Sequence, residues 1–474
     1  MRIGLDFGTT NSGAAMFDGE RVHLFPLDPA SHAPTVMRST LYVTRDHQVF
    51  IGQEAIGTYY QQNIGADGYI RPSKMMRQYV GEIELTFGVV ESVKGYPGGP
   101  ATFVRDVYVL VDELTPGRLL RSLKSGLATG YRGTTIFNRY YELEELIAIY
   151  LREVRQRVEA HTGQTVDGVV LGRPVNFAGS EEEADNERAE GRLRRAAEKA
   201  GFREVAFELE PVAAALYYEL TAGTPQNVAV FDFGGGTLDI TVIRIGEPGR
   251  RQVFATGGVG IAGDTFDQRI IERLMLDHFG RGSTWGEDGA PFPAQYTDTL
   301  VHWQTIPELN RPETLRFLRL AQIAGSHPSR VRALESLLVN NYAIRLIDEV
   351  ERAKIALSAA HFALIALAGD DINVWQPLTR SQFEALIADI ARRVEACLLD
   401  TLARSGLGVD EIDTVVRTGG SAQIPCFVEL LERIFGPQKV VLSDAFSSVT
   451  GGLAVRAGME ERGRWGEGEK AGEK

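Results

Sequence analysis

The sequence is poor in cysteine and contains no long uninterrupted apolar run. Its two cysteines, Cys397 and Cys426, are too few for a disulfide framework or a four-cysteine zinc site. No stretch approaches the roughly 18 apolar residues that a membrane-spanning helix needs. The N-terminal segment carries an acid, Asp6, where a signal peptide would be apolar. We therefore expect a soluble, cytoplasmic protein with no membrane partner.

Basic residues are also scarce relative to acidic ones. Fifty Lys and Arg stand against 63 Asp and Glu among 474 residues, which gives a formal net charge of −13. Such a balance repels phosphate at long range and argues against nucleic acid as a partner. A phosphate-bearing small ligand can still bind if backbone N–H groups or a metal lie close to it. Apolar residues make up 44% of the chain and charged residues 24%, which is typical of globular proteins, and the length suits two or three domains.

Glycine, by contrast, is abundant, and many of the 51 glycines follow apolar runs. The segment Ile3 to Thr10 (IGLDFGTT) reads as a short strand that breaks into a turn of small residues. Residues 228–239 (VAVFDFGGGTLD) repeat this layout, with Asp-Phe-Gly directly after a β-prone run in both. The recurrence of one strand-and-turn layout at such a distance along the chain is typical of a duplicated domain. We expect two similar halves that face each other.

Helix-like and strand-like patterns alternate between and after these two segments. Apolar residues recur at spacings of three and four in the ranges 143–158, 264–279, 342–358 and 379–404, which predicts helices. Short β-prone runs, for example 166–175 and 414–417, predict buried strands. This alternation indicates an α/β fold with covered sheets.

The two glycine turns have the chemistry of a phosphate site. Successive glycines let backbone N–H groups point inward at an anion. Asp6 and Asp232, at the mouths of the turns, are suited to bind Mg²⁺ through water, because this ion keeps much of its hydration shell. Ordinary tight hairpins are the alternative, but two matched turns with an acid at the same offset make it the weaker one. The turn residues are Gly8, Thr9, Thr10, Asn11, Gly234, Gly235, Gly236 and Thr237.

Three further features are weaker when taken singly. A third turn, Gly419-Gly420-Ser421, follows a predicted strand, and ligands of open α/β sheets gather at such carboxyl ends. Lys74 is a candidate cation for phosphate charge, although alone it reads as a surface lysine. Glu210 begins a predicted helix and could orient water or a metal, but an acid in the first turn also complements the helix dipole.

Six short motifs together resemble the ATPase domain of the seventy-kilodalton heat-shock (Hsp70) chaperones, in the same order along the chain. They cover about residues 1–458 and are DFGTTNS (6–12), ELEPVAAAL (208–216), DFGGGTLD (232–239), GDTFDQR (263–269), ERAKIALS (351–358) and GGSAQIP (419–425). The resemblance implies an actin-like ATPase fold of the ribonuclease H type. This fold has duplicated βββαβα cores in two lobes around a nucleotide cleft.

The resemblance also implies a role for each matched residue. Asp6 and Asp232 would hold hydrated Mg²⁺, and the turn residues would hold the phosphates of ATP or ADP. Lys74 would stabilise the γ-phosphate and the attacking water, and Glu210 would help to position metal and water. Pro174 would relay the nucleotide state to another domain. The residues expected to face the nucleoside are Glu351, Lys354, Ser358 and Gly420, and the neighbouring Gly419 is also expected to bind the nucleotide.

At two positions that would contact the adenine base, the sequence differs from the family pattern. Arginines that sandwich the adenine in the family are replaced here by Ile355 and Gln423. If cation–π values apply, each loss removes roughly 0.5–2 kcal/mol of stacking. We therefore expect weaker ATP binding or lower selectivity for the base.

The resemblance divides the chain into two lobes and a tail. Lobe I is expected to comprise 1–226, with 439–458 returning to it, and lobe II to comprise 227–438 with an insert at about 280–340. Residues 459–474 are expected to form a disordered polar tail. The chain resembles a stand-alone, truncated family member without the β-rich peptide-binding domain.

The expected function is that of a weak, Mg-dependent, chaperone-related ATPase with a protein partner or co-chaperone. A bacterial actin-like filament protein is the alternative, and a sugar kinase of the same fold is a more distant one. The favoured docking site is the insert, because aromatic side chains often anchor interfaces. A local mini-core of the same side chains is an equal alternative. These aromatic residues are Trp285, Phe292, Tyr296 and Trp303.

Overall fold

The structure is a computed structural model. It describes residues 1–31, 33–63, 75–87, 101–112, 116–220, 222, 224–246, 251–302, 306–340, 342–443 and 447–471. For residues 63, 75–87, 101–112, 307, 308 and 461–471 only the backbone is described. Within this part of the chain, no helix combines the length and the apolar character needed to cross a membrane.

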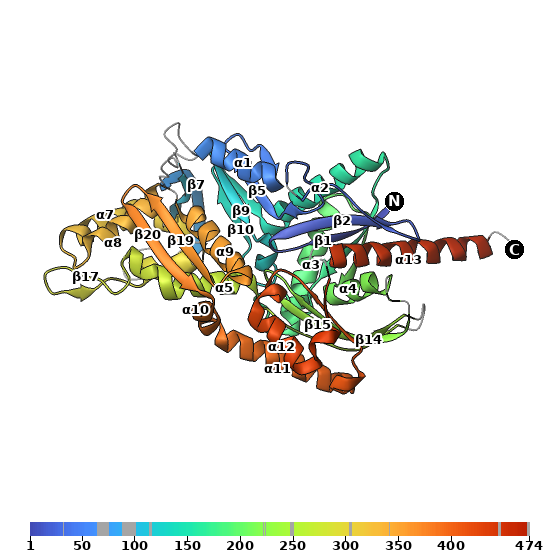
Figure 1. The fold of residues 1–474 in the computed structure, drawn as a ribbon. Helices are drawn as coiled ribbons and strands as arrows, with labels where there is room; N and C mark the ends of the chain where they lie inside the picture. Colours follow the sequence, from blue (N-terminus) through green and yellow to red (C-terminus); the bar gives the residue numbers. More distant parts are fainter. Residues whose placement is uncertain are drawn as a thin grey trace, which may run out of the picture.

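The first large sheet belongs to the N-terminal half of the chain (Figure 1). Its first three strands form antiparallel pairs, and the later two strands lie parallel to the first. A short strand, β4 (Met37–Arg38), also pairs with β2. In spatial order the strands are β13 (Glu204–Leu209), β12 (Gly168–Arg173), β1 (Arg2–Phe7), β2 (Asn11–Phe17) and β3 (Val22–Leu24).

The second large sheet repeats this arrangement strand for strand. Again three antiparallel strands come first, and two later strands are added in parallel. The predicted duplication of a βββαβα core is therefore confirmed. In the corresponding order the strands are β22 (Val440–Leu442), β21 (Thr414–Thr418), β14 (Gln226–Phe233), β15 (Leu238–Ile245) and β16 (Gln252–Val259).

Helices cover both sheets and fill the space between them. Two helices of each half pack on the outer face of their own sheet, and one helix of each half lies between the sheets (Figure 1). The outer helices are α2 (Leu143–Thr162) and α3 (Glu183–Lys199) in the first half, and α11 (Ala388–Ser405) and α12 (Pro425–Phe435) in the second. The inner helices are α4 (Glu210–Glu219) and α13 (Ser447–Ala471).

The two inner helices approach each other unusually closely. A Cβ atom on Gly452 of α13 would lie only 1.6 Å from the carbonyl oxygen of Ala213 on α4, so only glycine fits there. Side chains from both sheets complete this shared core, among them Val170 of β12 and Val230 of β14. The crossing of α4 and α13 therefore joins the two halves.

The C-terminal part of the chain differs from the predicted boundaries in two ways. Residues 440–442 were expected in lobe I, but they form β22 at the edge of the second sheet, and the described return to lobe I begins with α13. The tail expected to be disordered from Met459 is helical as far as Ala471. Glu460 accounts for part of this, because it forms ion pairs with Arg2 and Arg456.

Smaller elements are inserted into each half. The first half carries α1 (Gly52–Asn63), η1 (Leu123–Gly126), a sheet of β6 (Val49–Ile51), β5 (Thr40–Thr44) and β9 (Gly117–Arg121), and the hairpins β7 (Met75–Phe87) with β8 (Ala101–Asp112) and β10 (Gly133–Ile136) with β11 (Arg139–Glu142). The second half carries α5 (Gly263–Ile270), η2 (Ile271–Met275), η3 (Leu276–Phe279), α9 (Ala343–Ala359), α10 (Arg380–Leu386), η6 (Val409–Glu411), η7 (Ser421–Gln423), η8 (Pro437–Lys439) and the hairpin β19 (Phe362–Gly369) with β20 (Ile372–Thr379).

The expected insert at 280–340 forms short elements around an aromatic cluster. Trp285, Phe292 and Tyr296 all pack against Phe317 of α7, with ring centroids 4.8–5.8 Å apart. These three side chains therefore form a mini-core and do not present an exposed docking surface, while Trp303 lies outside the described residues. The elements are β17 (Thr284–Trp285), β18 (Ala290–Pro291), α6 (Gln295–Asp298), η4 (Thr299–Val301), η5 (Ile306–Leu309), α7 (Pro312–Ile323) and α8 (Pro328–Val339).

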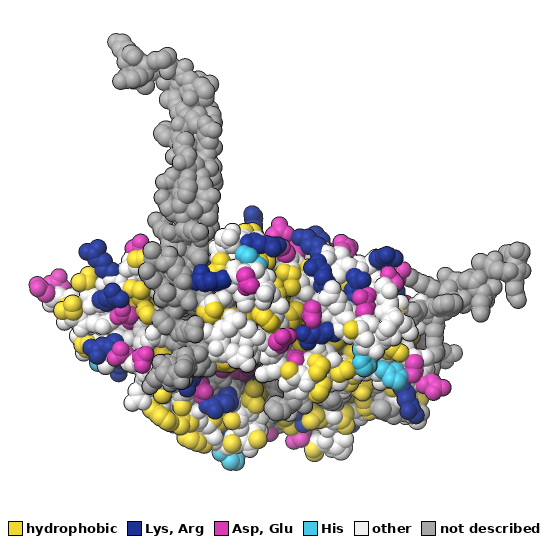
Figure 2. All heavy atoms as spheres, turned by 90° about the horizontal axis from the view of Figure 1, so that it is seen from above, with side chains coloured by type: hydrophobic (Ala, Val, Ile, Leu, Met, Phe, Trp, Pro, Cys, Tyr) yellow, Lys and Arg dark blue, Asp and Glu magenta, His cyan; other side chains and the backbone are white. Residues whose placement is uncertain are grey.

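The described surface mixes charges of both signs. Figure 2 shows basic and acidic side chains interspersed over one face of the molecule, with apolar side chains between them. The net negative charge of the chain is thus not gathered into one patch on this face.

Candidate functional site

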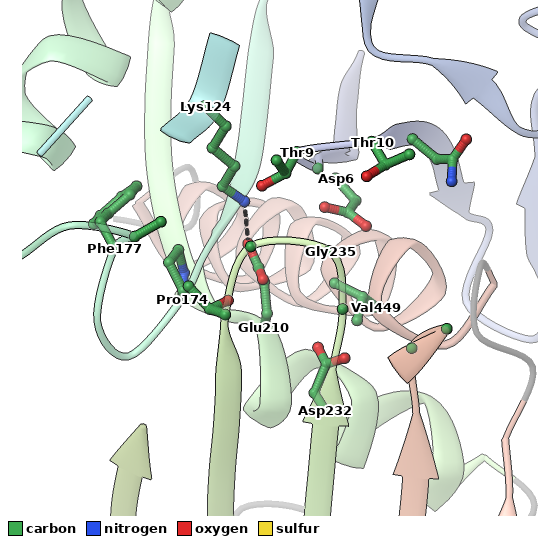
Figure 3. Close-up of a pocket in the computed structure, with 18 residues that line it drawn as sticks. Asp6, Thr9, Thr10, Lys124, Pro174, Phe177, Glu210, Asp232, Gly235 and Val449 are labelled. Atoms are coloured by element: carbon green, nitrogen blue, oxygen red, sulfur yellow. Dashed lines mark hydrogen bonds and ion pairs between the residues drawn. The ribbon is translucent and has the colours of Figure 1, made fainter. Parts of the chain in front are cut away.

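Two backbone turns face each other where the two halves meet (Figure 3). The first, Gly8–Thr10, joins β1 to β2, and the second, 234–237, joins β14 to β15. A Cβ atom built on Gly236 would lie 2.5 Å from Thr9 Oγ1, and one on Gly235 would lie 2.6 Å from Thr10 Oγ1. The two halves therefore bring their matched turns together, with backbone and hydroxyl groups converging on one space.

The third turn lies beside the second. Gly419 follows β21 with a φ of +88°, and a Cβ atom there would lie 2.3 Å from the carbonyl oxygen of Phe233. The neighbouring Ser421 hydroxyl donates a 2.6 Å hydrogen bond to the Gly234 carbonyl. This contact fixes the third turn to the end of β14.

A polar pocket of about 120 Å³ lies between the three turns. Most residues predicted to bind phosphate or metal line it, so the fold brings these residues together. The predicted residues in its wall are Asp6, Gly8, Thr9, Thr10, Asn11, Pro174, Glu210, Asp232, Gly234, Gly235, Gly236, Thr237, Gly419 and Gly420, and the others are Lys124, Phe177, Ala178 and Val449.

Buried carboxyl groups give the pocket its electrostatic character. Burial and the nearby charge of Glu210 raise the pKa of Asp6 to about 7, although Lys124 opposes the shift. Burial and the same glutamate raise the pKa of Asp232 well above its usual range. Lys124 is the only cationic side chain among the described residues that line the pocket. The pocket thus sets three carboxyl groups against one ammonium group, and two of the three have raised pKa values.

Lys124 lines the pocket but is not among the residues predicted from the sequence. It lies on η1, is 6% exposed, and places its ammonium group 2.5 Å from Glu210 Oε1 (Figure 3). Burial alone would lower the pKa of Lys124, but Glu210 and Asp6 outweigh it and raise the pKa. The predicted Lys74 lies outside the described residues. A lysine inside the apolar run LLRSLKSGL (119–127) was the available signal for Lys124.

Asp239 is a second residue that was not singled out, although it closes the motif DFGGGTLD. It accepts a short hydrogen bond from the backbone N–H of Val175, which follows Pro174 in the other half. Its second oxygen accepts a 2.7 Å hydrogen bond from the Thr237 hydroxyl. Burial and the charge of Glu210 raise the pKa of Asp239 to about 7. This side chain therefore ties the proline segment to the second phosphate turn.

The residues predicted to face a nucleoside are more scattered. Lys354 donates to the Gly263 carbonyl at 3.0 Å and pairs with Asp267 at 2.7 Å, so its ammonium group is engaged within its own half. Glu351 pairs with Arg121 of β9 at 3.2 Å. Ser358 is half-buried near the end of α9 and does not line the phosphate pocket. Of the predicted set, only Gly419 and Gly420 line the phosphate pocket.

The donor set fits a hydrated divalent cation. Asp6 and Asp232 approach the same space from the two halves, and both offer carboxylate oxygens, which Mg²⁺ prefers. Among the described residues, no group of three or more His, Cys, Asp or Glu side chains is arranged to hold a metal directly. Contact through water matches this arrangement, and a cation would oppose the burial and the repulsion that raise the pKa values of Asp6 and Asp232.

Comparison with known families identifies the chain. A family model described as Hsp70 protein matches residues 128–284 and 336–464, which is more than half of the sequence. The chain belongs to the Hsp70 family. Its fold is accordingly the actin-like ATPase fold, and the duplicated sheets and central pocket agree with this assignment.

The match to the Hsp70 model does not include every part of the site. It contains Glu210, Asp232 and Gly419, whereas Asp6 and Lys124 fall in the unmatched residues 1–127. The geometry nevertheless brings these residues of both parts into one pocket. Residues 285–335, which form most of the insert, are also outside the match.

Proposed function

We propose that this Hsp70 family member binds Mg·ATP in the central pocket and hydrolyses it slowly, with nucleotide state setting the closure of the lobes. Membership of the family makes the chain an ATP-binding, chaperone-related protein. The observation that carries the finer proposal is the placement of Lys124, Glu210, Asp6 and Asp232 around two facing phosphate turns.

The turns would bind the phosphates through backbone N–H groups and the hydroxyls of Thr9 and Thr10. Lys124 is positioned to stabilise negative charge on the terminal phosphate, because its ammonium group points into the pocket (Figure 3). Asp6 and Asp232 would hold Mg²⁺ through water, and the bound ion would neutralise phosphate charge. Glu210 orients Lys124 by a direct ion pair. Positioning and charge stabilisation suffice for slow phosphoryl transfer to water without a strong base.

Lobe closure would act through contacts that cross the cleft. The bond from Val175 N–H to Asp239 connects the proline segment of the first half to the second phosphate turn. The ion pair between Arg121 and Asp348 connects β9 to α9 at 2.5 Å. A bound nucleotide would contact the same turns. Whether it carries two phosphates or three would therefore shift the equilibrium between arrangements of the lobes. A co-chaperone that recognises one lobe arrangement would respond to the nucleotide.

A magnesium titration of nucleotide binding tests the assignment. Asp232→Asn should lower the affinity for Mg·ATP by about tenfold, because an amide is a weaker partner for the hydrated cation. Binding of ATP without magnesium should not fall. Asp288→Asn is the matched control, since this acid is exposed on the insert. Superimposable magnesium titrations for wild type and Asp232→Asn would refute the metal assignment.

A further inference from the structure

A second and larger cavity lies beside the phosphate pocket. It has a volume of about 370 Å³, within the range of small-molecule sites, and both halves of the chain contribute to its wall. It meets the phosphate pocket at Thr9, Thr10 and Gly236, which line both spaces. The cavity is therefore continuous with the phosphate site but extends away from it, toward α9 and the insert.

Part of the cavity wall is apolar. Five aliphatic side chains from four elements line the cavity, and they suit a hydrocarbon group. They are Leu119 of β9, Ile271 of η2, Val301 of η4, and Ile344 and Ile347 of α9.

The charged groups of the cavity are paired, with one exception. Arg121 binds Asp348 and Glu351, and Arg38 also lies 3.6 Å from Glu351. Asp267 pairs with Lys354. Asp264 has no ion-pair partner among the described residues, although it lines the cavity.

Groups of both halves act on Asp264. Burial raises the pKa of this carboxyl group to about 6, while the charges of Lys354 and Arg121 and the side chain of Ser122 oppose the shift. The cavity wall thus contains a carboxyl group that can accept a hydrogen bond or pair with a cation.

Part of the cavity wall lies outside the residues that the Hsp70 model matches. Leu119, Arg121, Ser122 and Val301 fall in the segments 1–127 and 285–335. Of the residues of α9 that the resemblance assigns to the nucleoside, Glu351 lines the cavity, whereas Lys354 and Ser358 do not.

We propose that this cavity is a second ligand site, which binds a small amphipathic amine with its ammonium group at Asp264 and its apolar part against Ile271, Ile344 and Ile347. Charge complementarity selects the class of ligand, because Asp264 is the one charged carboxyl group of the described wall without an ion-pair partner, whereas Asp267, Glu351 and both arginines are already paired. The site does not require ATP hydrolysis, and it can be occupied together with the phosphate pocket.

Three probes of similar shape test the proposal on the full chain. Tryptamine carries an ammonium group, tryptophol carries a neutral hydroxyl, and indole-3-acetate carries a carboxylate. Calorimetric titration should show tryptamine binding at least about tenfold more tightly than tryptophol, with indole-3-acetate weakest. This comparison uses the wild-type protein and so does not depend on how a variant folds.

Variants then locate the bound amine. Asp264→Asn should lower tryptamine affinity about tenfold and leave tryptophol affinity nearly unchanged, because shape is kept and charge is lost. Asp288→Asn makes the same charge change on the exposed insert and should have no effect. Mg·ADP should bind together with tryptamine.

Three results would overturn the proposal. The first is equal affinity for all three probes, and the second is an unchanged tryptamine affinity in a folded Asp264→Asn variant. The third is displacement of tryptamine by adenosine, which would make the cavity part of the nucleoside site. A failure of the magnesium titration described above would leave this proposal untouched, because the amine site has its own readout.

Discussion

The Tyr60 hydroxyl on α1 donates a 2.8 Å hydrogen bond to Asp348 on α9, although 288 positions separate the two residues. Arg121 of β9 reaches the other oxygen of the same carboxylate at 2.5 Å. One acid of the second half is thus held by two side chains of the first. These contacts bridge the cleft and oppose its opening.

We predict that Arg121→Ala accelerates release of ADP by about tenfold, because Asp348 and Glu351 each lose a partly buried partner. Tyr60→Phe should have a smaller effect of about fivefold, as expected for one hydrogen bond worth about 1 kcal/mol. Stopped-flow release of a fluorescent ADP measures both rates. Arg139→Ala is the control, because Arg139 pairs with Glu145 inside the first half. Unchanged release in both cleft variants would show that these contacts do not restrain the lobes.

Lys124→Ala should lower single-turnover hydrolysis by about 10²- to 10³-fold, the usual effect of removing one group that stabilises charge in the transition state. The affinity of the Lys124→Ala variant for ATP should change far less, because the charge of Lys124 would matter most in the transition state, as the bond to the terminal phosphate breaks. Lys199→Ala is a control at an exposed lysine.

A parallel Lys74→Ala variant separates the two candidate lysines. The resemblance implies a catalytic role for Lys74, whereas the described pocket contains Lys124. A loss of turnover confined to Lys74→Ala would make the ion pair of Lys124 with Glu210 purely structural.

The raised pKa of Asp6 predicts how stability depends on pH without metal and nucleotide. The ordinary pKa is 3.8 and the folded value is about 7, so the folded state keeps a proton that the unfolded chain has released. Stability should therefore fall as the pH rises from about 4 to about 7. Asp6→Asn removes this contribution and should raise the melting temperature at pH 8 by roughly 2–4 °C.

Scanning calorimetry at several pH values checks this prediction. Asp18→Asn is an informative control, because backbone N–H groups lower the pKa of this exposed carboxyl group instead of raising it. Magnesium and ADP should reverse the ranking and stabilise the wild type more than Asp6→Asn. A melting temperature for Asp6→Asn below that of the wild type in metal-free buffer at pH 8 would contradict the argument.

Ile355→Arg and Gln423→Arg should restore the cations that the family resemblance places around the base. Ile355 is 58% exposed on α9, so a longer polar side chain can be accommodated there. Each change should strengthen ATP binding by roughly 0.5–2 kcal/mol. Competition between ATP and GTP would show whether selectivity increases as well. Equal affinities of the wild type and the double variant would exclude a role for these positions in base binding.

The phosphate turns could be predicted from sequence because their signal is local. Asp-Phe-Gly followed by Gly and Thr defines the end of a strand and the turn after it, and the repeat of this pattern indicated the duplication. The position of Lys124 has no such local motif, since its partner Glu210 lies 86 positions further along the chain.

Two other differences between the sequence-based predictions and the structure also arise from long-range contacts. Trp285 and Tyr296 form a mini-core because α7 supplies Phe317, and periodicity does not reveal that partner. The polar composition after Met459 indicated disorder, yet the helix begins in a buried, apolar segment, and Glu460 meets Arg2 of the first strand. The composition of a segment does not show which distant residues will pack against that segment.

The close contact of Gly452 with Ala213 gives the two halves a common crossing point between the sheets. Beyond this point α13 stays with the first half, because Gly458 lies against Phe17 and Glu460 pairs with Arg2. The helix continues for 19 residues from Gly452 to Ala471, which is about 29 Å at about 1.5 Å per residue. A 10° rotation of the first half about this crossing would therefore move Ala471 by about 5 Å, at a point remote from the nucleotide.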